Sequence, residues 1–318
     1  MRRIIAAVAV LATLLTASAC TADPKPSKPA PGTKIAVGVI PIIDVAPIYL
    51  GKQKGFFAAR GIDLTLSPEQ GGAPIVKGVI SGKYQFGFSN VTSLMAAEND
   101  GAPLKAVACG VASTGRPGRD FSAVVVRDGS PIRTAKDLAG KRVAVNILKN
   151  VGDTTVRESV RKAGGDPTRI RFEAMPFPAV PGALQAGTVD AAWVVEPQLS
   201  EVITQGGEVV ASNFVDTAPD MTVAMYFTGT ALIAKDPDLV GRFTAAINES
   251  LRYADGHPDD VRAVIGTYTP ITDVVRTSMI LPNWPIAVNR SSVQQLAKLG
   301  RQDGILTKDP ALEQLLPG

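Results

Sequence analysis

Along most of the chain, segments with the apolar pattern of short strands alternate with segments that have the apolar period of amphipathic helices. Apolar, β-rich stretches predict strands at residues 34–39, 62–67, 84–88, 104–109, 121–127, 141–145 and 221–227. Helical patterns separate most of these strands, and two further strand and helix units extend to about residue 212. This regular alternation predicts an α/β fold.

Helix boundaries are indicated by proline, glycine and short polar residues. Pro47 suits the first turn of a helix that we expect to run to Arg60, where Gly61 ends it. Other helices are predicted at residues 91–99 and 153–163, and the chain is mostly helical from Pro237 onward. His257 lies in a turn sequence between two of these later helices.

A weak internal repeat relates residues 81–88 to residues 186–193. In both segments a small residue and a glycine end a helix, and a strand follows that runs into a polar junction. The same order of elements around the two segments predicts two similar α/β lobes. Ligands of such lobes collect at the carboxyl ends of the strands, so we expect one cleft between them. The loops expected to line it are 40–47, 71–73, 89–92, 146–154 and 193–197.

The N-terminal region has the pattern of an export signal. Arg2 and Arg3 precede a small and apolar run, and small residues lead to Cys20. This order resembles a bacterial lipoprotein signal, which implies a signal peptide at 1–19 and an acylated Cys20. The proline-rich segment 20–32 would then be a lipid-anchored tether on the extracytoplasmic face of the cell membrane. Ordinary secretion stays open, because Ala17 stands where leucine is usual.

Composition excludes several classes of function. The apolar fraction is 45% and the charged fraction 19%, as in ordinary globular proteins. The net charge of +4 falls to about +2 without Arg2 and Arg3, and no basic run predicts nucleic-acid binding. With one histidine and, beyond Cys20, only Cys109, we expect no zinc site, no Ser-His-Asp catalysis, no disulfide and no cofactor. We expect a monomer.

Several segments resemble substrate-binding proteins of bacterial ABC importers, in the group that serves nitrate, sulfonates, taurine and thiamine-pyrimidine precursors. They are PIIDVAPIYL at 41–50, GFF at 55–57, GIDL at 61–64, GKYQFGFSN at 82–90, DLAGKRVAV at 137–145 and VDAAWVVEP at 189–197. The resemblance implies a type II periplasmic-binding-protein fold, whose two Rossmann-like lobes close on a small-molecule ligand and deliver it to ABC permease subunits. It also implies that the protein is not an enzyme.

The same resemblance suggests lobe boundaries. Lobe 1 would comprise 33–125 and 226–318, and lobe 2 would comprise 126–225. The two crossovers between the lobes would fall near 123–128 and 221–228.

Candidate ligand-binding residues are those that follow strands or face the expected cleft. They are Asp44, Gly72, Ser89, Asn90, Asn146, Asp153, Thr154, Trp193 and Glu196. Most of the polar ones have a second interpretation as helix caps, and Trp193 could be a stacking surface or part of the core. Glu196 precedes a proline, which favours an extended or turn conformation and projects it from the strand end.

These candidates are acidic or amide-bearing, whereas a sulfonate or nitrate site would need charge-assisted donors such as arginine. Arg116 and Arg119 lie in a segment that reads as a solvated loop. The hypothesis is therefore a small polar organic ligand, such as a pyrimidine-type heterocycle or an amine. Binding of an alkylsulfonate, taurine or nitrate remains an alternative. Two others are a biosynthetic enzyme of the thiamine-pyrimidine or quinone pathway on the same fold, and a lipoprotein that binds a protein partner.

Overall fold

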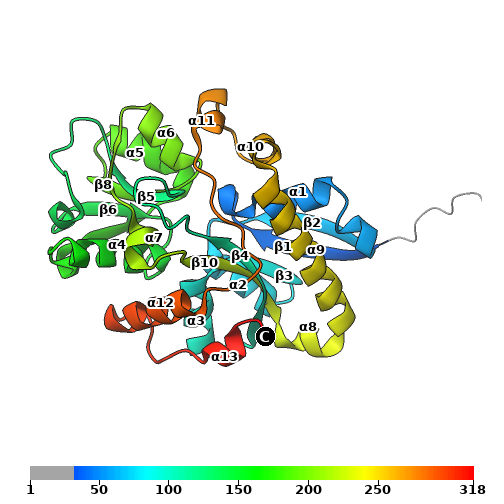
Figure 1. The fold of residues 1–318 in the computed structure, drawn as a ribbon. Coiled ribbons are helices and arrows are strands. Elements are labelled where there is room, and N and C mark those ends of the chain that lie inside the picture. Colours follow the sequence, from blue (N-terminus) through cyan, green and yellow to red (C-terminus); the bar gives the residue numbers. More distant parts are fainter. Residues whose placement is uncertain (1–31) are drawn as a thin grey trace, which may run out of the picture. The chain divides into compact units, whose positions relative to one another are not determined.

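The computed structural model describes residues 32–318, and its centre is a pair of five-stranded sheets (Figure 1). The first, in the order β2-β1-β3-β10-β4, consists of β1 (Thr33–Val39), β2 (Ile62–Pro68), β3 (Phe86–Asn90), β4 (Leu104–Ala112) and β10 (Thr222–Gly229). The second, in the order β7-β6-β8-β5-β9, consists of β5 (Ser122–Val126), β6 (Arg142–Val145), β7 (Arg171–Ala174), β8 (Ala191–Val195) and β9 (Glu208–Ala211). Each sheet and the helices packed on it form one lobe, so the predicted two-lobe α/β fold is confirmed.

Helices of the N-terminal two-thirds of the described chain alternate with the strands. They are α1 (Ala46–Gln53), α2 (Gly72–Ile80), α3 (Val91–Asn99), α4 (Val151–Lys162), α5 (Val180–Gln185), α6 (Gln198–Thr204) and α7 (Asn213–Thr217). Short 3₁₀ turns are η1 (Ile43–Val45), η2 (Ala58–Arg60), η3 (Ala135–Leu138), η4 (Pro167–Arg169) and η5 (Phe177–Ala179). The remaining helices are α8 (Thr230–Lys235), α9 (Pro237–Gly256), α10 (Pro258–Ile265), α11 (Asp273–Ser278), α12 (Arg290–Gln302) and α13 (Leu312–Leu315).

Both sheets have the same mixed pairing, which fits the weak internal repeat. In the first, β1 pairs in parallel with β2 and β3, while β10 lies antiparallel between β3 and β4. In the second, β6 pairs in parallel with β7 and β8, while β5 lies antiparallel between β8 and β9. Strands β3, β5 and β8 are buried along their whole length, which explains the continuous apolar sequence of β8 and the apolar residues 123–126 of β5.

The crossings between the lobes lie in loops beside the expected segments. The chain leaves the first sheet after Ala112 and enters the second at Ser122, and it returns between Ala211 and Thr222. The segments expected as crossovers, 123–128 and 221–228, instead pair within a sheet, as β5 in the second and β10 in the first. The expected lobe boundaries at 125 and 225 therefore fall inside these strands. Both strands are apolar and paired on two sides, which favours a central place in one sheet.

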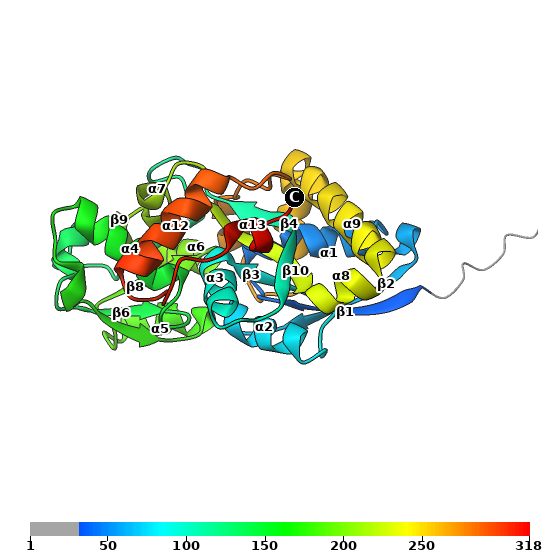
Figure 2. The same cartoon turned by 90° about the horizontal axis from the view of Figure 1, so that it is seen from below.

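The C-terminal region, expected to return to the first lobe, contacts both lobes. Helix α11 packs against α6 of the second lobe, and Ala112 forms an isolated bridge with Asn283. Helix α12 packs against α3 and also against α4 and α7, beside which it lies in Figure 2. Arg161 of α4 forms an ion pair with Asp303, which follows α12. This region is therefore a further connection between the lobes.

Local differences from the predicted elements have identifiable causes. The helix expected from Pro47 to Arg60 ends at Gln53, and Gly55 adopts a φ of 81° before the separate turn η2. Helix α4 begins at Val151 and not at residue 153, because the Asn150 side chain caps it. Cys109 is buried on β4, and burial raises the pKa of its thiol to about 12.

The expected signal peptide and Cys20 lie outside the described residues, as does the expected tether except for residue 32. Within the described part of the chain, none of the helices is both long enough and apolar enough to cross a membrane.

The contact between α1 and α9 makes a testable prediction about packing. A Cβ at Gly51 would lie 1.9 Å from Ser250 Oγ, which is held by a hydrogen bond to the Ala246 carbonyl. We expect Gly51→Ala to lower the free energy of unfolding by about 1–3 kcal/mol, because the two helices must separate. As a matched control, Gly241→Ala in α9 has open space and should raise it by roughly 0.5–1 kcal/mol. Urea denaturation measures both; equal stability of the two variants would contradict the prediction.

Candidate ligand-binding site

A small cavity lies between the two lobes, at the carboxyl ends of β1, β3, β6 and β8. From the first lobe its lining includes Ile40, Ile42, Asp44, Phe88 and Asn90. From the second lobe it includes Asn146, Val151, Phe177, Trp193, Val195 and Phe214. The cavity volume is about 20 Å³, room for about one water molecule. Four of the nine candidates from the sequence, Asp44, Asn90, Asn146 and Trp193, meet here.

Asp44 places a buried carboxyl group at this cavity. It lies in η1 and is only 3% exposed, and its Oδ1 has no hydrogen-bond partner among residues 32–318. Burial, with a smaller contribution from the nearby Asp120 carboxylate, raises the pKa of Asp44 from 3.8 to about 7. A group with this pKa can accept a hydrogen bond, or share a proton with a ligand, near neutral pH.

The loop that carries Asp44 is fixed by three side chains from the C-terminal region. The Tyr268 hydroxyl donates to the Ile42 carbonyl at 3.1 Å, and the Thr269 hydroxyl donates to the Pro41 carbonyl at 3.1 Å. Trp284 Nε1 donates to the carbonyl of Asp44 itself at 3.2 Å. Trp284 is thus a packing and positioning residue.

Two amide side chains face Asp44 across the cavity lining. Asn146 directly follows β6, and its Oδ1 is buried without a partner among the described residues. Asn90 caps α3, since its Oδ1 accepts from Ser93 N at 2.8 Å. That hydrogen bond engages the Asn90 carbonyl oxygen and leaves its amide nitrogen for a ligand.

Aromatic rings form much of the wall. Trp193 contacts Phe177 at 5.3 Å and Phe214 at 5.9 Å between ring centroids, both in inclined arrangements. Its Nε1 donates to Ser122 Oγ at 2.8 Å, so the indole offers the ligand a surface and not its N–H group. Phe88, Phe177 and Phe214 were missed by the sequence analysis, because a phenylalanine beside a cavity has the same sequence pattern as one in the core.

The other candidates in the same loops have structural roles. A Cβ at Gly72 would lie 2.1 Å from Ser89 Oγ, so the glycine allows α2 to approach β3 closely. Asp153 Oδ2 accepts from Lys149 N at 3.0 Å, and Thr154 Oγ1 donates to the Asn150 carbonyl at 3.1 Å. These contacts stabilise the turn before α4. Burial raises the pKa of Asp153 to about 6.

Glu196 is completely buried but lies outside the cavity lining. Its carboxylate accepts hydrogen bonds from Ser200 N at 3.0 Å, Ser200 Oγ at 2.9 Å and Ile280 N at 2.9 Å. Burial raises its pKa to about 7. Glu196 therefore ties α6 to the C-terminal region. Glu196 directly follows β8, and with Ser200 and Ile280 it lines a separate pocket.

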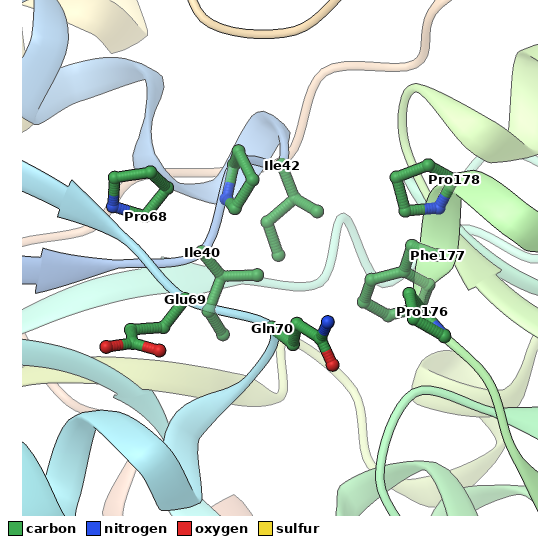
Figure 3. Close-up of a pocket in the computed structure, with 9 residues that line it drawn as sticks. Ile40, Ile42, Pro68, Glu69, Gln70, Pro176, Phe177 and Pro178 are labelled. Atoms are coloured by element: carbon green, nitrogen blue, oxygen red, sulfur yellow. The ribbon is translucent and has the colours of Figure 1, made fainter.

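A wider opening adjoins the cavity, and we call it the vestibule (Figure 3). It has a volume of about 440 Å³ and is lined by Ile40, Pro41, Ile42, Pro68, Glu69, Gln70, Pro176, Phe177 and Pro178. Ile40, Ile42 and Phe177 line both spaces. The vestibule therefore adjoins the cavity and shares part of its wall.

The two lobes are hydrogen-bonded to each other close to the cavity. Ile43 N donates to the Glu196 carbonyl at 3.1 Å, and Asn150 Nδ2 donates to Ser93 Oγ at 2.7 Å. Since the enclosed volume suits about one water, a larger ligand requires these lobes to separate or the lining to move. Among residues 32–318, no group of three or more His, Cys, Asp or Glu side chains could hold a metal ion.

Two α/β lobes that enclose a cavity at the carboxyl ends of their strands define the periplasmic-binding-protein fold. A profile of the NMT1/THI5-like family matches residues 42–261, which is more than half of the chain. The protein therefore belongs to the NMT1/THI5-like family, and the resemblance seen in the sequence is confirmed at the level of family and fold.

Individual similar proteins include both binding proteins and an enzyme. The ligand-binding component of an ABC-type import system from Staphylococcus aureus, solved with zinc bound, has a TM-score of 0.77 and 16% identity. That match covers 89% of this chain and 96% of the other. The alkanesulfonate-binding protein of Xanthomonas axonopodis pv. citri bound to MOPS has a TM-score of 0.76 and 17% identity, covering 90% and 99%. The 4-amino-5-hydroxymethyl-2-methylpyrimidine phosphate synthase of Candida albicans (strain WO-1) is 23% identical over 239 residues, 70% of this chain and 67% of that protein.

The raised pKa of Asp44 predicts a pH-dependent stability difference. Between pH 3.8 and about 7 the carboxyl group is ionised in the unfolded chain but protonated in the folded one, so ionisation favours unfolding as pH rises. The wild-type protein should therefore lose free energy of unfolding as pH rises through this window, whereas Asp44→Asn should not. The difference between the two proteins should grow in favour of Asp44→Asn up to about pH 7 and stay constant above it. Thermal denaturation at several pH values tests this, with the exposed Asp63→Asn as control. A difference that stays constant with pH would contradict the assignment.

The contacts of Glu196 predict a structural role. Glu196→Ala should lower the free energy of unfolding by about 1–3 kcal/mol, because Ser200 N and Ile280 N lose their acceptor in a buried place. The control is Glu201→Ala. Glu201 lies in α6, the helix that follows Glu196, and its side chain makes no hydrogen bond in the described residues. Urea denaturation measures the effect. Wild-type stability combined with lost ligand binding would instead make Glu196 a ligand contact.

Proposed function

We propose that this protein is the solute-binding component of an ABC importer and captures a small planar heterocycle that bears amino groups. One observation carries the proposal. The interlobe cavity has aromatic walls, and its lining residues Asp44 and Asn146, one from each lobe, each have a buried acceptor Oδ1 without a partner among residues 32–318. A ligand with two donor groups satisfies both acceptors and thereby connects the lobes.

The aromatic walls favour a planar ligand. Trp193, Phe177 and Phe214 surround the cavity with large flat surfaces, which suit a ring better than a branched or tetrahedral group. An aminopyrimidine combines a flat ring with N–H donors at its edge. The printed name of the Candida albicans relative indicates an aminopyrimidine as the compound that protein makes, which supports this choice.

Sulfonate, taurine or nitrate binding is less well supported. Oxyanions need donors, and no lysine or arginine lines the cavity in the described part of the chain. Asp44 would repel such an anion whenever it is ionised. Arg116 and Arg119, the only arginines considered from the sequence, line a separate pocket with Ile280 and Asn283.

The remaining expectations from the sequence belong to the same proposed role in import. The signal-like N-terminus and Cys20 support a lipid-anchored protein on the extracytoplasmic face of the cell membrane, working as a monomer with permease subunits. The name of the Staphylococcus aureus structure, a component of an import system, supports the same role. A permease gene and an ATPase gene beside this one would support it further.

Synthesis of a pyrimidine is the second candidate function, favoured by the named activity of the Candida albicans relative. Residue types that are common in catalytic sites are few in this chain. This chain has one histidine, exposed His257 between α9 and α10, and its described cysteine is the buried Cys109. Incubation with candidate precursors, followed by mass spectrometry, tests this function; a new product would replace the binding role.

Calorimetry with 4-amino-5-hydroxymethyl-2-methylpyrimidine, taurine, an alkylsulfonate and nitrate tests the binding proposal. We expect binding of the pyrimidine and no binding of the three anions. Asn146→Ala and Asp44→Ala should each weaken binding by about 1–3 kcal/mol, roughly 5-fold to 150-fold, because each removes a buried acceptor. Asp63→Asn should bind as wild type. Tight binding of a sulfonate with none of the pyrimidine would overturn the choice of ligand.

A further inference from the structure

The vestibule beside the cavity is lined mostly by apolar residues. Four of its nine lining residues are prolines, and Ile40, Ile42 and Phe177 add apolar surface. We propose that the ligand is bipartite, with its amino-bearing ring at Asp44 and Asn146 and an apolar substituent in the vestibule. This inference rests on the proposed function, and it adds a second subsite and a narrower ligand class.

Continuity of the two spaces is the first argument. The same three side chains, Ile40, Ile42 and Phe177, line the vestibule and the cavity. A ring held in the cavity therefore has its outer edge at the vestibule. The vestibule, at about 440 Å³, is by far the larger of the two, so a substituent on that edge has room where the ring itself has little.

The lining chemistry is the second argument. Proline has no N–H group and a fixed φ, so Pro41, Pro68, Pro176 and Pro178 form a rigid wall that offers few donors. Such a surface favours an apolar group, because burying it removes apolar area from water on both sides.

Polar side chains in the vestibule are few. The Glu69 carboxylate accepts from the Tyr84 hydroxyl at 2.5 Å and from Lys83 Nζ at 3.0 Å, and in Figure 3 it points away from Phe177. Gln70 reaches toward the middle of the opening in the same view. With Glu69 engaged elsewhere, Gln70 is the polar contact available to the substituent.

Both lobes contribute to the vestibule, which links this subsite to lobe closure. Pro41 follows β1 and Pro68 ends β2, so both come from the first lobe. Pro176 and Pro178 flank Phe177 in the second lobe (Figure 3). An apolar substituent between them contacts both walls only when the lobes are together. It therefore stabilises the closed arrangement in addition to the two polar contacts of the ring.

The test is calorimetry with 4-amino-2-methylpyrimidines that carry 5-alkyl chains from methyl to hexyl. Affinity should rise about fourfold for each methylene that enters the vestibule, and then level off. Pro178→Asp should abolish this rise and leave the affinity of the methyl compound unchanged. Pro178 is exposed, so the replacement is compatible with folding. Ala179→Asp adds the same charge one residue away, outside the lining, and should keep the rise.

The two proposals fail in different ways. If the methyl compound binds and longer chains bind no better, the vestibule subsite is overturned and the proposed function stands. A rise with chain length that Pro178→Asp does not change overturns the subsite as well. If no pyrimidine of the series binds, the proposed function is overturned, and the bipartite ligand with it.

Discussion

The placement of a buried carboxyl group at the junction of two lobes is the constraint on which the rest of this structure depends. Removing Asp44 from water without a cationic partner is costly, and the raised pKa near 7 expresses that cost. The loop bearing it is therefore fixed from several directions. Tyr268, Thr269 and Trp284 hold its carbonyls from the C-terminal region, and the Glu196 carbonyl accepts from Ile43 N in the second lobe. Distant parts of the chain thus converge on one loop.

Much of the fold follows from sequence periodicity, because buried strands and amphipathic helices leave strong local patterns. The alternation of strands and helices, the two lobes and the cap at Asn90 were all predictable in this way. The C-terminal region was not, since the pattern of α12 shows that one face is apolar but not that α3 and α4 share that face. The ends of the crossovers were misplaced for a related reason: an apolar strand looks the same in either sheet.

The candidate site was predictable in part. Some predicted residues line the cavity and others do not, and this difference has a physical cause. A polar side chain after a strand can face the cleft or cap the next helix, and sequence alone does not distinguish these roles. Asp44 and Asn146 line the cavity, and each has a buried Oδ1 without a partner in the described residues. Asp153 also has an unpartnered Oδ1, but it lies outside the lining, and its Oδ2 accepts from Lys149 N. Thr154 donates to the Asn150 carbonyl of its own helix start. Glu196 has the burial and raised pKa of a functional group, yet three local donors engage it. Burial and a raised pKa therefore matter less here than the combination of a place in the cavity lining and an oxygen without a donor in the described residues.

That criterion also explains how closure and selectivity arise from the same atoms. Two residues of the cavity lining, one from each lobe, carry acceptor oxygens for which the described residues provide no donor. Bringing the lobes together desolvates both, which costs free energy unless a third molecule supplies the donors. A ligand with suitably spaced N–H groups removes this cost and favours the closed arrangement, while an oxyanion adds further acceptors and increases it. Under the proposed function, selection against anions needs no separate device, because the residues that would reject an oxyanion are the ones that would bind an amine.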